Sequence, residues 1–181
     1  MIEDRLLILG LRRGRPQALR QVYDKYKVEL LRLAVVLVGD AHTAEDIVHD
    51  VFVRFAQSAD RFGLTGSLRS YLITSVVNRV RNHVRDSRRH AETTLDRAAL
   101  HLVPEPGPPQ WAILSEELAW LSEVLKQLPY EQREVVCCHI EMGMPLRRIA
   151  VLQNVSLNTA KGRYRYGIEK LRVLLDGKVE R

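Results

Sequence analysis

Apolar residues recur at spacings of three and four along almost the whole chain, and this periodicity constrains the fold more than any other feature. The pattern is typical of amphipathic helices, each of which buries one apolar stripe. No segment alternates apolar and polar residues as a strand would, and no internal repeat is visible. The 181 residues suffice for one ordinary domain or two small ones with their own cores. We therefore expect an all-α protein.

The apolar stripes predict a succession of helices separated by residues that commonly cap or end helices. Asp40 and Thr43 offer oxygens to cap the second helix, and Thr43 with Asp46 resembles a capping box. Ser67 is placed to cap the third helix, after a glycine-containing stretch at residues 60–66 that is typical of a loop. The predicted helices cover about residues 16–38, 43–59, 67–86, 113–128, 131–141, 145–153 and 157–175.

Helical periodicity fails between residues 87 and 110, where proline is frequent. Proline cannot continue a helix and favours extended chain. The breaking residues are Pro104, Pro106, Gly107, Pro108 and Pro109. We therefore expect two small helical domains, at residues 1–90 and 113–181, joined by a flexible linker at residues 91–112.

Charges are segregated along the chain, whose net charge is +6. Residues 69–90 carry six arginines against one acid, and residues 144–172 carry seven basic residues against one acid. Acidic stretches precede both blocks, at residues 40–60 and 116–141. The basic blocks suit a polyanion and the acidic faces suit another protein. The alternative is that these are only solvated helix faces, as most charge runs are.

The second basic block has the arrangement of a helix-turn-helix: a short helix, a tight turn and a longer basic helix. Asn154 stands where the turn needs a left-handed residue, and Ser156 is placed to cap the second helix. The inward stripe of that helix is Leu157, Ala160, Tyr164, Ile168 and Leu171. We expect its outward side to contact DNA through Ser156, Asn158, Thr159, Lys161, Gly162, Arg163, Arg165 and Tyr166.

Within this set the residues have different expected roles. Lys161 and Asn158 are the predicted base readers, and Arg163 and Arg165 divide between bases and phosphates. Gly162 costs about 1 kcal/mol relative to alanine in mid-helix. We expect that cost to be offset by close approach of the backbone to a DNA groove or to a neighbouring helix.

The first basic block also presents a polar face, opposite its apolar stripe. An aromatic ring, amides and arginines at helical spacing suit single-stranded or melted nucleic acid. The face comprises Tyr71, Asn78, Arg81, Asn82, Arg85 and Arg88. Arg61, Phe62, Thr65 and Ser67 could form a pocket for an unstacked base, although Phe62 could equally fill the core. A solvated arginine-rich helix is the alternative.

Short motifs stand in a fixed order in both halves of the chain. The first half carries G-R-P-Q-A-L at residues 14–19, A-E-D-I-V-H-D-V-F at 44–52, and Phe62 with L-R-S-Y-L at 68–72. The second half carries L-P-Y-E-Q-R-E-V at 128–135 and N-T-A-K-G-R at 158–163. In this order and spacing they resemble regions 2 and 4 of the extracytoplasmic-function sigma factors, and the resemblance covers nearly the whole chain.

The resemblance implies a transcription initiation factor. In that family, region 2 docks on the clamp helices of the largest RNA polymerase subunit and captures the melted −10 element. Region 4 binds the flap of the second-largest subunit and reads the −35 element. The implied partners are core RNA polymerase and promoter DNA, with an anti-sigma factor as a further candidate.

The resemblance also assigns site residues. It implies a polymerase-docking face at Asp46, His49, Asp50, Phe52 and Arg54. It implies −10 contacts by Arg61, Phe62, Ser67, Tyr71, Asn78, Arg81, Asn82 and Arg85, with Asn78 at the family's base-reading asparagine and Tyr71 at its usual tryptophan. Departures from the family pattern are Pro145 for a serine cap, Arg148 for a glutamate, Gln153 for an apolar residue and Tyr166 for an arginine. These bear on the promoter sequence more than on the function.

The sequence favours neither a metal site nor an enzyme active site. One helix face gathers four possible ligands, His42, Asp46, His49 and Asp50, but the acids are better explained as a docking surface. Neighbours in a helix point about 100° apart, so we expect one of Cys137 and Cys138 in the core and the other near the surface. No nucleophile–base pair, phosphate loop or H-E-x-x-H motif is visible. We predict no enzyme, no metal and no cofactor.

The start of the chain is acidic where a signal peptide would be basic, and no stretch is apolar enough to cross a membrane. We expect a cytoplasmic protein without membrane insertion. Two alternatives to a sigma factor stay open: a helix-turn-helix regulator acting without core polymerase, and a sigma-like decoy for an anti-sigma factor. The region 2 resemblance argues against the first, and the retained Asn78, Arg81, Lys161 and Arg163 argue against the second.

Overall fold

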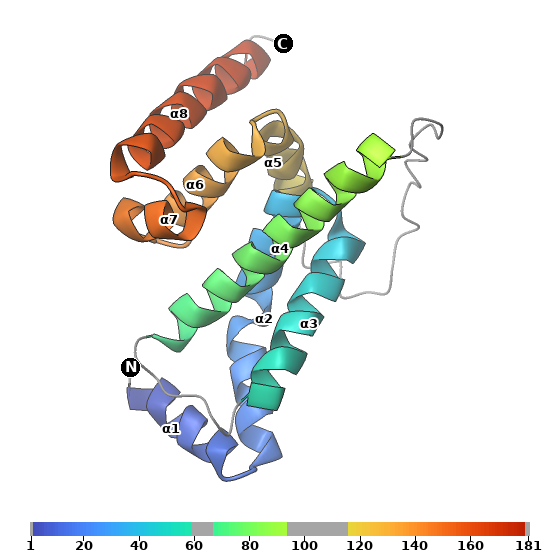
Figure 1. Ribbon diagram of the computed structural model, residues 1–181, viewed down its shortest axis with the longest axis vertical. Coiled ribbons are helices and arrows are strands. Elements are labelled where there is room, and N and C mark those ends of the chain that lie inside the picture. Colours follow the sequence, from blue (N-terminus) through green and yellow to red (C-terminus); the bar gives the residue numbers. More distant parts are fainter. Residues whose placement is uncertain (1, 59–66, 94–115, 180–181) are drawn as a thin grey trace. The chain divides into compact units, whose positions relative to one another are not determined.

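The computed structural model describes residues 2–58, 67–93 and 116–179, and every regular element in these ranges is an α-helix (Figure 1). This confirms the prediction of an all-α chain. Each helix except α1 corresponds to a predicted one. In chain order they are α1 (Ile2–Arg12), α2 (Pro16–Val38), α3 (Ala41–Ser58), α4 (Leu68–Thr93), α5 (Glu116–Lys126), α6 (Tyr130–Ile140), α7 (Leu146–Gln153) and α8 (Leu157–Val179).

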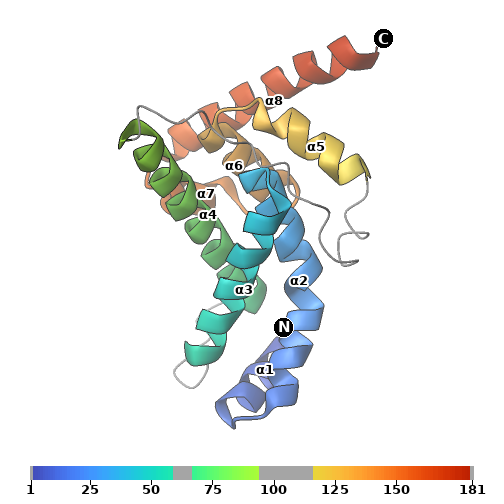
Figure 2. The ribbon, with the colours of Figure 1, turned by 90° about the vertical axis from the view of Figure 1, so that its right-hand side faces the viewer.

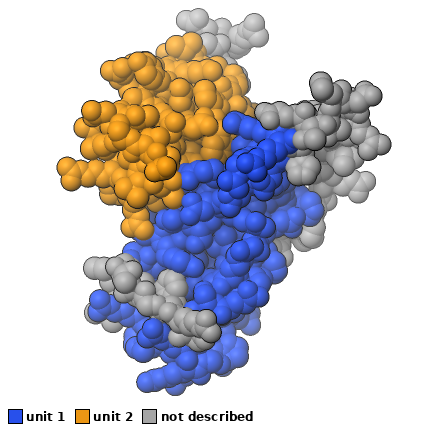
Figure 3. Space-filling model, in the orientation of Figure 1, with its two compact units in different colours: residues 1–34, 40–111 blue, residues 35–39, 112–181 orange. Residues whose placement is uncertain are grey.

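The chain divides into two compact units, which Figure 3 shows in different colours. Residues 1–34 and 40–111 form the first unit, and residues 35–39 and 112–181 form the second. Most of the predicted linker lies outside the described residues. Its first part, residues 91–93, belongs to α4. Each unit buries apolar side chains of its own.

Helix α1 precedes the first helix that periodicity predicted. Its apolar residues are consecutive rather than spaced by three and four, so no stripe is visible in the sequence. Leu7 and Ile8 are buried, whereas Leu6 is exposed. The helix packs closely on α2, because a Cβ atom at Gly10 would fall 2.9 Å from Cβ of Ala18.

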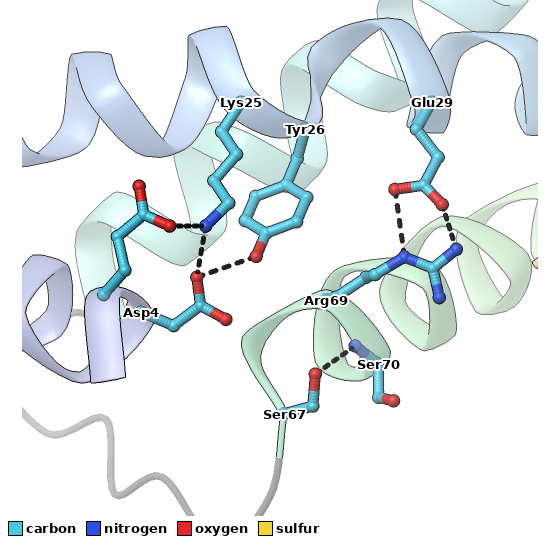
Figure 4. A network of polar contacts seen from close by, with 8 residues as sticks. Asp4, Lys25, Tyr26, Glu29, Ser67, Arg69 and Ser70 are labelled. Atoms are coloured by element: carbon cyan, nitrogen blue, oxygen red, sulfur yellow. Dashed lines mark hydrogen bonds and ion pairs between the residues drawn. The ribbon is translucent and has the colours of Figure 1, made fainter. Parts of the chain in front are cut away.

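Polar contacts fasten both α1 and α4 to α2 (Figure 4). Lys25 donates from Nζ to Oδ1 of Asp4 at 2.9 Å, and the hydroxyl of Tyr26 donates to the same oxygen at 2.9 Å. Burial disfavours the charge on Asp4, but the hydrogen bonds from Lys25 and Tyr26 outweigh it, so the pKa of Asp4 is lowered. Farther along α2, Glu29 accepts two hydrogen bonds from Arg69 in the first turn of α4.

The core of the first unit is formed by α2, α3 and α4, and α3 and α4 run side by side (Figure 2). Its fully or nearly buried side chains include Val22, Leu30, Leu33, Val48, Val51, Phe55, Leu72, Val76 and Val80. Of the two caps predicted for α3, the structure confirms Asp40. The N–H of Thr43 donates to Oδ2 of Asp40 at 2.8 Å and its hydroxyl donates to the same oxygen. Asp40 is therefore the cap, and the capping box of Thr43 with Asp46 is wrong.

Helix α4 continues to Thr93, beyond the predicted end at residue 86. Residues 85–89 are all exposed. This stretch therefore has no apolar stripe from which periodicity could predict a helix.

In the second unit, α6 packs against α5, α7 and α8. The rings of His139 on α6 and Tyr164 on α8 meet edge to face, with centroids 5.0 Å apart. The expectation for the cysteines is wrong, because Cys137 and Cys138 are both buried. Residues 133–138 of α6 are all buried, so the helix has no solvent side there. Burial raises the pKa of Cys137 to about 12, which keeps this thiol protonated and unreactive.

Candidate nucleic-acid interfaces and polymerase-docking face

Helices α7 and α8 form the predicted helix-turn-helix, with Asn154 in the turn. Asn154 has φ 54° and ψ 48°, the left-handed conformation that the sequence predicted. The N–H of Val155 donates to the carbonyl of Ala150 at 3.0 Å, which closes α7 in the manner of a Schellman end. Ser156 then caps α8, because its hydroxyl accepts a hydrogen bond from the N–H of Thr159 at 3.0 Å. The predicted turn and cap are both confirmed.

One side of α8 is exposed and carries most of the predicted −35 residues. Asn158, Lys161, Arg165 and Tyr166 are exposed there, whereas Ala160 on the opposite side is buried. The guanidinium of Arg165 lies 4.9 Å from the ring centroid of Tyr166 and donates to its hydroxyl at 3.1 Å. Arginine and tyrosine therefore form one joined polar surface beside Lys161. Ser156 and Thr159 are also exposed, at the N-terminal end of this side.

Arg163 does not share this exposed side. It is half-buried, and its Nη1 donates a hydrogen bond of 2.7 Å to Oε1 of Gln153. At 100° per residue it lies roughly 140° around the helix from Asn158. The side chain therefore follows the flank of α8 toward α7.

Gly162 is half-buried, and a Cβ atom at this position would meet nothing within 4 Å. We expected this glycine to allow close approach either to a DNA groove or to a neighbouring helix. The second expectation is wrong within the described part of the chain. Approach to a DNA groove stays a prediction.

Helix α4 carries the predicted −10 residues on its outer face. Tyr71, Asn78, Asn82 and Arg85 fall within about 60° of arc on a helix of 100° per residue. Asn78, Asn82 and Arg85 are exposed, and Arg81 lies at the edge of the face and is half-buried. The structure thus brings an aromatic ring, two amides and a guanidinium onto one surface.

Tyr71 connects this face to the core. Its side chain is 36% exposed, and its ring centroid lies 6.0 Å from that of the buried Phe55. Ser67 is exposed just before α4, and its hydroxyl lies 3.5 Å from the N–H of Ser70, a long capping contact. Three other residues predicted at this site lie outside the described residues: Arg61, Phe62 and Thr65.

The predicted docking helix, α3, exposes Asp46, His49 and Arg54. Phe52, which was expected on the same face, is only 5% exposed. Its ring packs edge-on against Tyr23 of α2, with centroids 4.8 Å apart. Phe52 therefore belongs to the core behind the face, because α2 covers that side of α3.

Asp50 joins α3 to α4. Its Oδ2 lies 2.9 Å from Nε of Arg54 and 2.8 Å from Nε of Arg79 on α4. The carboxylate of Asp50 is thus already compensated by two guanidinium groups. Asp46 is the more exposed acid, and it lines a groove of about 220 Å³ between α2 and α3 together with Tyr23 and other residues.

Helix α7 carries three further polar residues to which the sequence analysis assigned no site. Arg147 and Arg148 are exposed in its first turn. Cations at a helix N-terminus oppose the helix dipole, and this unfavourable placement is the signal that could have identified them. Arg148 and Gln153 were noted only as departures from a family pattern, and Gln153 is the partner of Arg163.

Within the described ranges, no group of three or more histidine, cysteine or acidic residues is arranged to hold a metal ion. The helices that the structure describes include none that is long and apolar enough to span a bilayer.

The two units thus present two separate polar helix faces, and one of these helices is the second helix of a helix-turn-helix. This combination is typical of DNA-binding proteins. The Sigma-70 region 2 family matches residues 22–90, and the Sigma-70 region 4 family matches residues 124–173.

Known proteins are similar to this chain over more residues than the two Sigma-70 regions cover. The chain is 30% identical to the ECF RNA polymerase sigma factor EcfG of Rhodopseudomonas palustris, over 81% of this chain and 78% of that protein. The fold resembles that of CnrH, solved in complex with the cytosolic domain of CnrY, with a TM-score of 0.68 at 24% identity over 97% of this chain and 98% of that one. It also resembles RpoE of Bartonella quintana, solved with the anti-sigma factor NepR, with a TM-score of 0.67 at 22% identity over 90% and 99%. The chain belongs to the ECF family of RNA polymerase sigma factors.

Proposed function

We propose that this protein is a transcription initiation factor that binds core RNA polymerase and directs it to promoters with −10 and −35 elements. One observation carries the proposal: a single chain holds region 2 with an exposed Asn78 on α4 and region 4 with an exposed Lys161 on a capped α8. A regulator that acts without polymerase needs only the second of these features. A decoy for an anti-sigma factor needs neither exposed side chain.

At the −10 element, the partly exposed ring of Tyr71 provides a surface on which an unpaired base can stack. The amides of Asn78 and Asn82 lie on the same face of α4 and can form hydrogen bonds to base edges. Arg85, one turn farther, suits the phosphate backbone of the melted strand. The face therefore matches single-stranded DNA better than a closed duplex.

At the −35 element, α8 enters the major groove with its exposed side. The N-terminus of α8 and the hydroxyl of Ser156 suit a phosphate, because a helix N-terminus carries free N–H donors and partial positive charge. Asn158 and Lys161 lie in the first turns, where base edges are within reach. Arg165 with Tyr166 extends the contact along the groove or the backbone.

Polymerase docks on the exposed side of α3, with Asp46 and His49 beside the groove between α2 and α3. An anti-sigma factor is a second proposed partner, since RpoE of Bartonella quintana was solved with one. The protein supplies promoter recognition and DNA melting while the polymerase supplies catalysis, so the protein is not itself an enzyme. It acts where the polymerase acts, in the cytoplasm.

Selection from a random DNA library tests the proposal against its alternatives. With core polymerase present, the protein should enrich sequences that carry two elements at a fixed spacing. A helix-turn-helix regulator would enrich a site equally well without polymerase. A decoy would enrich no site under either condition.

A further inference from the structure

Gln153, the last residue of α7, connects three helices of the second unit. Its Nε2 donates to Oε1 of Glu134 and to the backbone carbonyl of Glu131 on α6, each at 3.0 Å. Its Oε1 accepts the 2.7 Å hydrogen bond from Nη1 of Arg163 on α8. Glu134 is fully buried, with 0% of its surface exposed. One amide thus joins a buried carboxylate to a guanidinium on the recognition helix.

An amide is suited to this position because it donates and accepts at once. A buried carboxylate needs hydrogen-bond donors, since burying a charge without them is costly. A guanidinium offers only donors, so it needs an acceptor to be held in place. An apolar side chain at residue 153 could satisfy neither Glu134 nor Arg163.

The contact determines where Arg163 points. The residue lies on the flank of α8 that faces α7, and its guanidinium is held by a half-buried partner. Lys161, two residues earlier, projects from the exposed side. The two cations of one short segment therefore have different surroundings.

We propose that Gln153 is a positioning residue for promoter recognition. It holds Arg163 in a hydrogen-bonded link from α8 to α6 and keeps its guanidinium from contacting phosphates. In this arrangement Gln153 and Arg163 set the orientation of α8, and Asn158, Lys161 and Arg165 contact DNA. The inference rests on the proposed function, because it assumes that α8 enters the −35 groove.

The salt dependence of the affinity for promoter DNA distinguishes a positioning role of Arg163 from a phosphate contact. Each phosphate contact by a basic residue contributes about one unit to the slope of log affinity against log salt concentration. A change in fold stability alone does not alter that slope. Methionine is the substitution of choice, because it keeps an unbranched side chain and helix propensity while removing the polar head.

The experiment measures binding of the full chain with core polymerase to promoter DNA over a series of salt concentrations. Four variants are compared with the natural sequence: Arg165→Met, Arg163→Met, Gln153→Met and the double variant Gln153→Met with Arg163→Met. We expect Arg165→Met to flatten the slope by about one unit, because Arg165 is exposed and suits the backbone, and Arg163→Met to leave it unchanged. Gln153→Met should steepen the slope by up to about one unit, because it releases Arg163, and the double variant should restore it.

Equal flattening by Arg165→Met and Arg163→Met would overturn the inference, because Arg163 would then be a phosphate contact. An unchanged slope in Gln153→Met would overturn it as well. If Gln153→Met does not fold, the comparison of Arg165→Met with Arg163→Met decides alone. If the natural chain with polymerase shows no promoter-specific binding, the proposed function fails, and that failure is visible before any variant is compared.

Discussion

Gly167 of α8 lies so close to Val136 of α6 that a Cβ atom on the glycine would fall 2.9 Å from Cγ2 of the valine. Real Cβ atoms essentially never approach a neighbour that closely, so one of the two helices would have to move. Gly162, little more than one turn earlier, has open space in the same position. Gly162 and Gly167 therefore form a matched pair within α8, because packing requires a glycine at the second position and not at the first.

Alanine at the two positions should change stability in different directions. Both variants gain about 1 kcal/mol of helix propensity, but overpacking at Gly167 costs about 1–3 kcal/mol. Gly167→Ala should therefore be less stable than Gly162→Ala by about 1–3 kcal/mol, measured by urea unfolding. If Gly162 serves close approach to DNA, Gly162→Ala will also lose promoter affinity although its fold is more stable. Equal stability of the two variants would contradict the packing of α8 on α6.

The attachment of α1 should depend on pH through Asp4. Its pKa is lowered in the folded state, so its contribution to stability is present above the unfolded pKa, near 3.9 for an aspartate. That contribution is lost as the pH falls through the folded value. Asp4→Asn should remove this acid-dependent part of the stability. The unfolding free energy of the variant should therefore fall less than that of the natural chain between about pH 5 and pH 2, which spans an ordinary and a lowered carboxyl pKa. Asp24→Asn, at an exposed residue of α2, is the control and should behave like the natural chain.

Charge reversal at Asp46 should weaken the binding of core polymerase. Asp46 is exposed beside the groove between α2 and α3, whereas Asp50 is engaged with Arg54 and Arg79. We expect Asp46→Arg to lower core affinity by about tenfold or more, because a like charge would replace a complementary one. Titration of labelled protein with core polymerase measures this. The control is Asp24→Arg, and equal losses in the two variants would remove α3 from the docking face.

Replacing Asn78 should impair DNA melting more than initial binding. Loss of a base contact costs about 1–3 kcal/mol. Asn78→Ala should therefore make open-complex formation on duplex promoters less favourable by about 1–3 kcal/mol. Permanganate reactivity of the −10 element measures the fraction of open complex. The effect should be smaller on a template in which the −10 element is already unpaired. His83→Ala, at an exposed residue of the same helix, should match the natural chain, and an equal defect would indicate a structural role for α4 instead.

The residues that follow helical periodicity were predictable, and those set by packing between helices were not. The stripes of α2, α3 and α8, the left-handed Asn154 and the Ser156 cap followed from spacing and residue type alone. The helix at Ile2–Arg12 was missed because its apolar residues are consecutive, and the end of α4 because its last turns have no apolar stripe.

At the candidate sites, residue type predicted chemistry but not direction. Phe52 and Arg163 both suited an exposed face by type, yet α2 covers the first and Gln153 holds the second. These partners come from other helices, so no pattern within one helix could reveal them. The same holds for Asp50, whose partner Arg79 lies 29 positions away, on the next helix.

Run-off transcription with purified core polymerase tests the central claim most directly. The template should carry a promoter selected by the protein with polymerase, and matched templates should carry a substituted −10 or −35 element. We expect a transcript of defined length only when core polymerase and this protein are both present, with strong loss on either substituted template. Core polymerase that gives the same transcripts with and without the protein, on all three templates, would contradict it.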